Sequence, residues 1–164
     1  MAKKTAEASL FTVEDYKANF KVNKKGKKEE SIQIAICEYL KLSYPNVIFT
    51  CDLASGMKLP IWIAAKHKKM RSSRGLPDLF IAHQKKTYGN VFSERVVHTN
   101  HGLFLELKKD GSSPFLKDGS LSKDKHVQEQ NKILQQLILQ GYKAEFAVGY
   151  DHAVEIIDEY LSAK

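Results

Sequence analysis

The spacing of apolar residues beyond residue 28 predicts an alternation of helices and strands. Apolar positions that recur every three or four residues are typical of a helix with one buried face. They predict helices over 29–44, 61–70, 125–140 and 151–161. Short apolar runs bounded by turn residues predict strands over 47–51, 78–82, 103–108 and 144–148. Residues 83–101 carry turn signals and allow two interpretations, an irregular segment or a small hairpin.

Individual residues add detail to these helices. Gly141 is expected to end the helix over 125–140 in the left-handed conformation. Asp151 is expected to cap the last helix. The helix over 61–70 is expected to carry Trp62 and Ile63 on its apolar side, with lysines towards its end that complement the helix dipole.

The order of these elements predicts the fold class. Helix, strand, helix, two or more strands, helix, strand and helix indicate an α/β protein with one mixed sheet flanked by helices. The chain has 164 residues and 43% hydrophobic content, which is enough for one domain with a proper core. Residues 1–28 are rich in lysine and weakly patterned. We therefore expect a basic N-terminal arm over 1–28 and a single domain over 29–164.

One predicted strand carries two charges inside an apolar run. Side chains alternate across a strand, so Phe104, Glu106 and Lys108 share one face, and three leucines share the other. Removing both charges from water costs free energy unless a metal, a partner or a substrate compensates. The pair is therefore a candidate for chemistry rather than for stability.

A further carboxylate stands at the mouth of a neighbouring strand, at Asp78. Hard divalent ions such as Mg²⁺ or Mn²⁺ prefer carboxylate oxygens, and they lower the pKa of bound water. Asp78 and Glu106 are thus candidate metal ligands, and Lys108 would orient the water or stabilise developing charge. The alternatives are a turn-forming Asp78 after Pro77 and an ordinary ion pair of Glu106 with Lys108 on a half-exposed sheet.

Glu29 is the preferred third acidic group. It lies three and seven residues before Ile32 and Ile36 and so shares their inward face, whereas Glu30 is turned by roughly 100°. The alternative is a solvated carboxylate that the helix dipole favours.

Gln130 is the candidate from the third predicted helix. It lies on the apolar stripe of that helix with Val127 and Leu134, which favours an active-site role over a satisfied core amide. His126 lies four residues earlier, on the same side of the helix, although a surface histidine is the preferred interpretation.

Charge favours a polyanionic partner. The chain has 26 Lys and Arg against 19 Asp and Glu, a formal charge of +7, which attracts nucleic acid. Arg71 and Arg74 are candidate phosphate contacts, with solvated loop charges as the alternative.

The remaining composition narrows the class of protein. Cys37 and Cys51 have no zinc-site spacing and are expected to be reduced thiols. No apolar run approaches the ~18 residues that span a membrane, and the first residues lack an apolar signal core. We expect a soluble cytoplasmic protein with no membrane partner.

These motifs together resemble a known nuclease family. Pro77-Asp78 followed by Glu106-Leu107-Lys108 is similar to the signature of the PD-(D/E)xK nuclease superfamily. Glu29 to Gln33 at the start of the first helix, and Gln130 before Gly141-Tyr142, resemble its VRR-NUC branch in the stand-alone phage and bacterial form, over residues 29–162. The resemblance implies a restriction-endonuclease-like core and metal-dependent cleavage of DNA. It also implies a homodimer acting on branched DNA such as Holliday junctions, in phage or bacterial replication, repair or recombination.

The resemblance also implies roles for residues. Mg²⁺ or Mn²⁺ would be held by Asp78, Glu106, the backbone carbonyl of Leu107 and Glu29. Lys108 and Gln130 would position water and phosphate, and DNA would be contacted by Arg71, Arg74 and Lys109. A non-catalytic DNA-binding module and an RNA-directed nuclease remain alternatives.

Three segments depart from the family pattern. Residues 83–101 are longer than the usual connection, and Leu121-Ser122 stands eight residues before Gln130 rather than about three, which leaves the start of that helix open. Asp52 stands where relatives often have Asn, and it either joins the metal shell or, as we prefer, shapes a turn.

Overall fold

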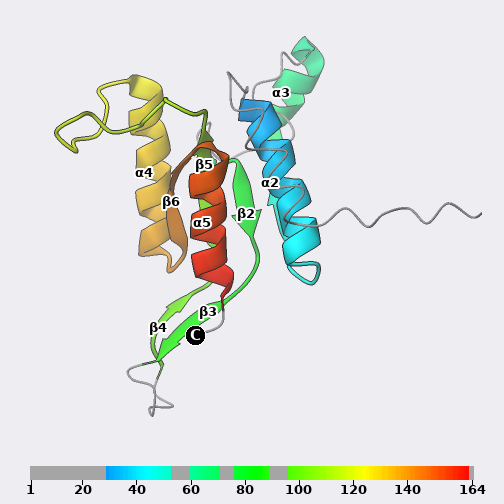
Figure 1. Ribbon diagram of the computed structural model, residues 1–164. Helices are drawn as coiled ribbons and strands as arrows, with labels where there is room; N and C mark the ends of the chain where they lie inside the picture. Colours follow the sequence, from blue (N-terminus) through cyan, green and yellow to red (C-terminus); the bar gives the residue numbers. More distant parts are fainter. Residues whose placement is uncertain (1–28, 53–59, 71–75, 89–95, 163–164) are drawn as a thin grey trace, which may run out of the picture.

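A four-stranded mixed sheet forms the centre of the computed structural model, with helices on both faces (Figure 1). The structure describes residues 29–52, 60–70, 76–88 and 96–162. In the order in which they lie side by side, the strands are β1 (Phe49–Cys51), β2 (Leu79–Ile81), β5 (Leu103–Lys108) and β6 (Lys143–Val148). The helices are α2 (Glu29–Ser43), α3 (Ile61–Met70), α4 (Lys125–Leu139) and α5 (Gly149–Leu161). The predicted fold class, a mixed sheet flanked by helices, is confirmed.

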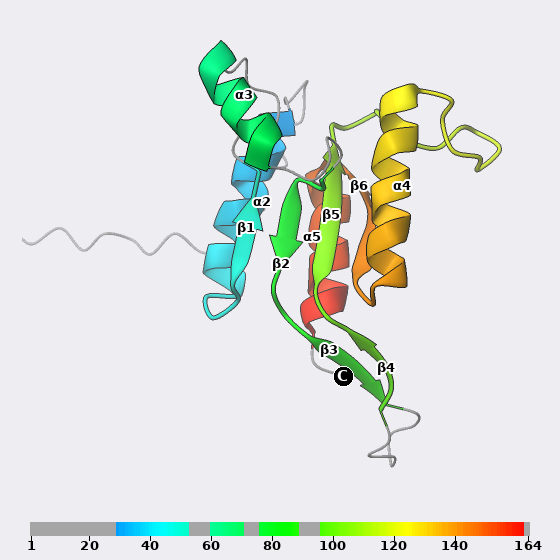
Figure 2. The same ribbon diagram turned by 180° about the vertical axis from the view of Figure 1, so that it is seen from behind.

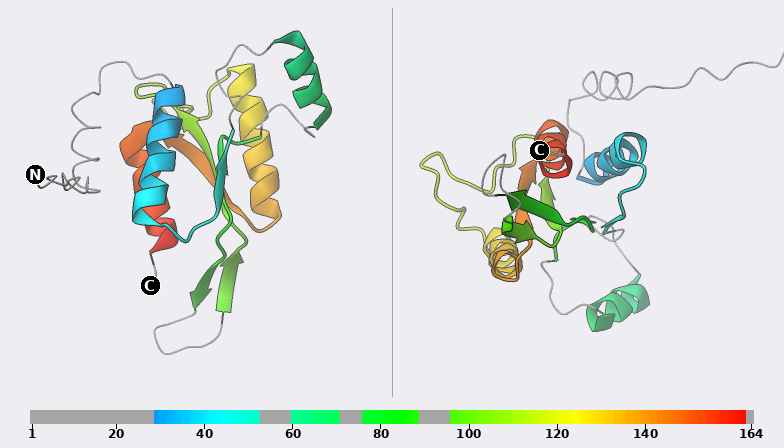
Figure 3. Two further views of the ribbon diagram at one scale, coloured as in Figure 1. Left: turned by 90° about the vertical axis from the view of Figure 1, so that its right-hand side faces the viewer. Right: turned by 90° about the horizontal axis from the view of Figure 1, so that it is seen from below.

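The alternation of side chains on β5 creates two apolar layers. Its three leucines are fully buried in the larger core, against α2 and α5 on one face of the sheet. Phe104 points to the other face and packs with Phe146 and with Leu134 of α4. Figure 2 and the end-on view in Figure 3 show α4 on the opposite side of the sheet from α2 and α5. The residues of β5 that face α4 therefore include both its charges.

The segment between β2 and β5 forms a hairpin, which is one of the two interpretations that its sequence allowed. Its strands are β3 (Lys85–Tyr88) and β4 (Val96–Asn100), which pair antiparallel with a register shift at Thr87 and Tyr88. The hairpin extends beyond the main sheet, at the end opposite α3 (Figure 1).

Of the two helix ends predicted from the sequence, one is confirmed and the other is wrong. Asp124 caps α4, because its carboxylate accepts hydrogen bonds from the backbone N–H groups of His126 and Val127. Gly141 has φ +85°, so the predicted left-handed end of this helix is confirmed. The predicted cap at Asp151 is wrong, since α5 begins two residues earlier and Asp151 lies inside its first turn. Gly149, with φ +75°, makes the sharp entry from β6 that allows this earlier start.

Helix α3 also differs from its expected packing. Ile63 is partly buried, but Trp62 is 71% exposed and so does not join an apolar side that packs on the sheet. The predicted basic arm over 1–28 lies outside the described residues. Within the described ranges, none of the helices is long and apolar enough to cross a membrane.

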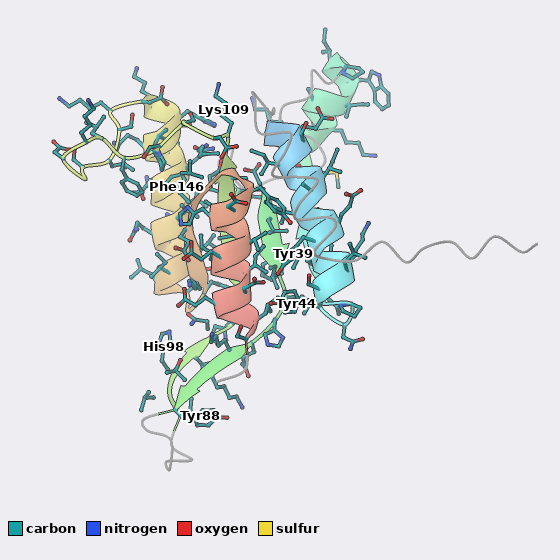
Figure 4. The ribbon with its side chains drawn as sticks, in the orientation of Figure 1. Tyr39, Tyr44, Tyr88, His98, Lys109 and Phe146 are labelled. Carbon is teal, nitrogen blue, oxygen red and sulfur yellow. The ribbon has the colours of Figure 1, made fainter. Side chains whose placement is uncertain are left out.

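Two tyrosine hydroxyls join α2 to α5. Tyr39, on α2, and Tyr44, just after it, both donate hydrogen bonds to Oδ1 of Asp158, the latter at 2.8 Å. Figure 4 labels both tyrosines between the two helices. Burial and the Asp158 carboxylate raise the pKa of Tyr44 to about 12, so its hydroxyl remains a donor at neutral pH.

Removal of this acceptor should destabilise the fold. We expect Asp158→Ala to lower the free energy of unfolding by about 1–3 kcal/mol, because two partly buried hydroxyls lose their acceptor. Glu155→Ala is the matched control, since Glu155 is an exposed carboxylate on the same helix and should change it by about 0.5 kcal/mol at most. Urea unfolding followed by circular dichroism measures both, and equal effects of the two variants would contradict the role of Asp158.

Candidate active site

The pairing of β2 with β5 brings two carboxylates together. Leu79 pairs with Leu105 in an antiparallel register, so Asp78, one residue before β2, stands opposite Glu106. The Leu107 backbone N–H donates to Asp78 Oδ2 at 2.9 Å, which continues the contact between the chains past the end of β2. Asp78 and Glu106 are both buried. A turn-forming role for Asp78 does not account for a buried carboxylate held by the neighbouring strand.

Gln33 of α2 is a site residue to which the sequence assigned no role. Its side-chain N–H donates to Asp78 Oδ1 at 3.0 Å, and its side chain is buried. Both oxygens of Asp78 therefore accept a hydrogen bond from a fixed donor. The sequence signal was present, because Gln33 adjoins the inward face of α2 marked by Ile32 and Ile36. A buried amide on such a face needs a polar partner.

Glu106, Lys108 and Gln130 form a closed triangle of hydrogen bonds. Lys108 Nζ donates to Glu106 Oε1 at 3.0 Å and to Gln130 Oε1 at 2.8 Å. The side-chain amide of Gln130 donates to the same oxygen of Glu106. All three side chains are buried, so the pair is not an ion pair on a half-exposed sheet. Gln130 reaches this network because α4 packs its inward stripe on the β5 face that carries the charges.

Burial and like charge set the electrostatics of the site. Burial, and then the negative charge of Asp78, raise the pKa of Glu106 to about 8, while Lys108 acts in the opposite direction. Two adjacent buried carboxylates resist ionising together, and a bound divalent cation would remove that repulsion. This donor set therefore fits a hard metal ion, although no three His, Cys, Asp or Glu side chains gather as a metal site within the described residues.

The other predicted site residues are placed only in part. Glu29 is the first residue of α2, but its side chain lies outside the described part of the chain, as do Arg71 and Arg74 entirely. Lys109, labelled in Figure 4, is exposed and follows β5 directly, at the end of the strand pair where Asp78 stands opposite Glu106. Leu107 lies between Glu106 and Lys108, and its backbone N–H bonds Asp78.

Two residues for which the sequence allowed more than one role, His126 and Asp52, lie beside the site. His126 is exposed, as preferred, but its Nε2 also lies 3.0 Å from Nε2 of Gln130, so its ring touches the triangle. The Asp52 backbone N–H donates to the Asp78 carbonyl at 2.7 Å, which ties the end of β1 to the start of β2.

Comparison with known proteins finds a similar solved structure. No family model matches the sequence, and neither does any curated protein. Among solved structures, a VRR-NUC domain protein is similar over 84% of this chain and 90% of its own, with a TM-score of 0.53 and 25% sequence identity. The match covers more than the central sheet and agrees with the resemblance that the motifs imply.

The raised pKa of Glu106 predicts how stability depends on pH. Between the ordinary value of 4.5 and the folded value of about 8, the folded protein keeps a proton that the unfolded chain loses. The free energy of unfolding of metal-free protein should therefore fall as the pH rises from about 5 to about 8. In Glu106→Gln this fall should be smaller. Urea unfolding in EDTA over this pH range tests the idea, and identical pH slopes for the two proteins would contradict it.

Proposed function

We propose that the chain is a VRR-NUC-type, metal-dependent endonuclease that hydrolyses phosphodiester bonds in DNA, and its similarity to a VRR-NUC domain protein supports this. The observation that carries the proposal is the buried cluster of Asp78, Glu106, Lys108 and Gln130. A stable fold gains little from two adjacent buried carboxylates, whereas phosphodiester hydrolysis requires ligands for a cation next to a positive donor.

The carboxylates would hold the ion. Asp78 and Glu106, with the backbone carbonyl of Leu107 and with Glu29 assisting, would bind Mg²⁺ or Mn²⁺. Such an ion neutralises phosphate charge and lowers the pKa of a bound water. Gln33 and the Leu107 N–H keep the Asp78 carboxylate in place, so the ligand is positioned before the ion arrives.

Lys108 would act on the water and the phosphate. An ammonium group has three N–H donors, and Glu106 and Gln130 take two of them among the described residues. The third would donate to the attacking water or to a phosphate oxygen, where charge develops in the transition state. Gln130 would fix the direction of that donor, because it bonds both Lys108 and Glu106.

The DNA would lie across the end of the sheet that carries Lys109. Support comes from the formal charge of +7 and from the exposed Lys109, which follows β5 directly. We propose Arg71 and Arg74 as further phosphate contacts. The substrate would be branched DNA, such as a Holliday junction, met during replication, repair or recombination in the cytoplasm of a bacterial or phage-infected cell.

Loss of either charged residue on β5 should slow cleavage strongly. We expect Glu106→Gln and Lys108→Ala each to slow cleavage of DNA by about 10²-fold or more in the presence of Mg²⁺ or Mn²⁺, because an ion ligand or a transition-state donor is lost. Labelled branched and linear DNAs and the RNA form of the same substrate, with either ion or EDTA, measure the rates.

The controls separate the nuclease from its alternatives. Glu155→Gln removes an exposed carboxylate from α5 and should cut at the wild-type rate. Cleavage by Glu106→Gln at that rate, or cleavage that survives EDTA, would sink the metal assignment. Binding without cleavage would favour a non-catalytic DNA-binding module, and cleavage of the RNA alone would favour an RNA-directed enzyme.

We also propose that the protein is a homodimer. Support comes from the hairpin, where Tyr88, Val96 and Val97 are exposed, and large exposed apolar side chains suit a contact with a second copy. The labels of Tyr88 and His98 in Figure 4 show how far this hairpin lies from Lys109. A contact there would leave the site open to DNA.

A charge on the hairpin should weaken such a dimer. Val97→Lys should shift the mass in solution towards that of a monomer, because an ammonium would be buried in the contact. Gln84→Lys, at an exposed polar position just before β3, should keep the wild-type mass. Light scattering coupled to size exclusion measures both, and a monomeric wild-type protein would contradict the proposal.

A further inference from the structure

Helix α3 projects from the molecule at the same end as the site. Figures 1 and 2 place it beside the start of α2, at the end of the sheet where β5 finishes. Figure 3 shows from a third side that it stands away from the sheet. It ends at Met70, eight positions before Asp78. The chain therefore leads from this helix into the first carboxylate of the site.

Most of its described side chains face solvent. Ile63 is partly buried, whereas Ile61 is 90% exposed, Trp62 71% and Met70 74%. A helix of ten residues is only marginally stable without packing, and a large aromatic ring gains little from contact with water. These features point to a partner that covers α3.

The polar residues of α3 identify the chemistry of that partner. Trp62, Lys66 and Lys69 lie four and three residues apart, so they share one face of the helix. Lys68 lies on the neighbouring face, and the helix contains no acidic residue. A helix dipole favours cations only within the last turn, so it explains neither Lys66 nor the exposed ring. Three positive charges without a negative one suit a polyanion rather than an apolar protein surface.

We propose that α3 is a DNA-binding element that recognises unpaired bases next to the cleaved phosphodiester. Lys66 and Lys69 contact backbone phosphates, and Trp62 stacks on a base. Inside a continuous duplex both faces of each base are covered by its neighbours. A free base face occurs where strands separate, at a flap, a branch point or an end. Trp62 thereby selects open DNA, that is, DNA with a free base face. The inference rests on the proposed function, because it takes DNA as the substrate.

The chain contains a single tryptophan, so its fluorescence reports on Trp62 alone. The full-length protein is titrated in EDTA, where cleavage does not interfere, with a flapped duplex and with a blunt duplex of equal length. We expect saturable quenching by the flapped DNA and clearly weaker quenching by the blunt duplex, because the flap adds unpaired bases to the terminal base faces that both DNAs share. Unchanged fluorescence at a flap concentration that saturates binding in a parallel anisotropy assay would overturn the stacking role.

Variants of the ring test the same contact without its fluorescence. With labelled DNA, Trp62→Ala should bind the flapped duplex about tenfold more weakly and the blunt duplex within about twofold of wild type, because one stacked base is lost. Trp62→Phe keeps an aromatic face and should retain most of the affinity. An equal loss on both DNAs, or no loss on either, would overturn the selection of open DNA.

The lysines have a matched control on α2. Lys66→Ala and Lys69→Ala should each weaken binding to both DNAs by about fivefold and reduce the salt slope by about one, as expected for one phosphate contact. Lys41→Ala removes an exposed lysine near the opposite end of α2 and should bind within about twofold of wild type. Equal effects of Lys41→Ala and Lys66→Ala on binding would show that the lysines of α3 contribute only to the overall charge. That result would overturn the role of α3 as a DNA-binding element.

Cleavage separates this inference from the proposed function. A Trp62→Ala protein that cuts every DNA at the wild-type rate overturns the role of α3 and leaves the nuclease assignment in place. A wild-type protein that binds flapped DNA through Trp62 but cuts no substrate supports α3 as a binding element and overturns the nuclease.

Discussion

Two carboxylates that face each other at the end of a buried strand pair are the constraint on which this structure depends. Asp78 and Glu106 are adjacent because β2 and β5 pair in one register, and that register is fixed by the leucines of the larger core. Their repulsion and desolvation oppose folding. The opposing free energy is reduced by donors from three elements, namely Gln33 from α2, Lys108 from β5 and Gln130 from α4. The two faces of the sheet are therefore linked through the site.

This linkage makes the second, smaller core part of the site. Leu134 and Gln130 lie one turn apart on α4, and both are buried. The leucine packs with Phe146, whose ring lies below the Lys108 ammonium at 5.8 Å. Packing of α4 on the sheet thus sets the position of the amide that holds Lys108 and Glu106. A change in this apolar layer would move the hydrogen-bond donors before it affected the opposite face of the sheet.

The alternation along β5 was enough to place Glu106 and Lys108 on one face, and the helical stripe of α4 was enough to turn Gln130 inward, since both are local periodicities. That the three residues act together followed from the family resemblance. The partner of Asp78 was not predictable in this way. Its contact with Gln33 joins residues 45 positions apart and depends on which strand lies next to β1. The sequence did not predict the exposure of Trp62, for a different reason. The apolar pattern of a helix is the same whether the helix packs on its own sheet or binds another molecule. The start of α5 was also not predicted, because it depends on the turn at Gly149 rather than on a capping side chain.

The charges of the site explain why binding and chemistry are assigned to different elements. The interior combines two carboxylates with one ammonium, so without a cation it does not attract a phosphate. Attraction must come from cations outside it, and Lys109 and the lysines of α3 stand at this end of the sheet. Because Asp78 follows the last residue of α3 by only eight positions, a DNA strand bound to that helix would enter the proposed site beside Asp78. The position of an unpaired base on Trp62 would then decide which phosphate reaches Lys108.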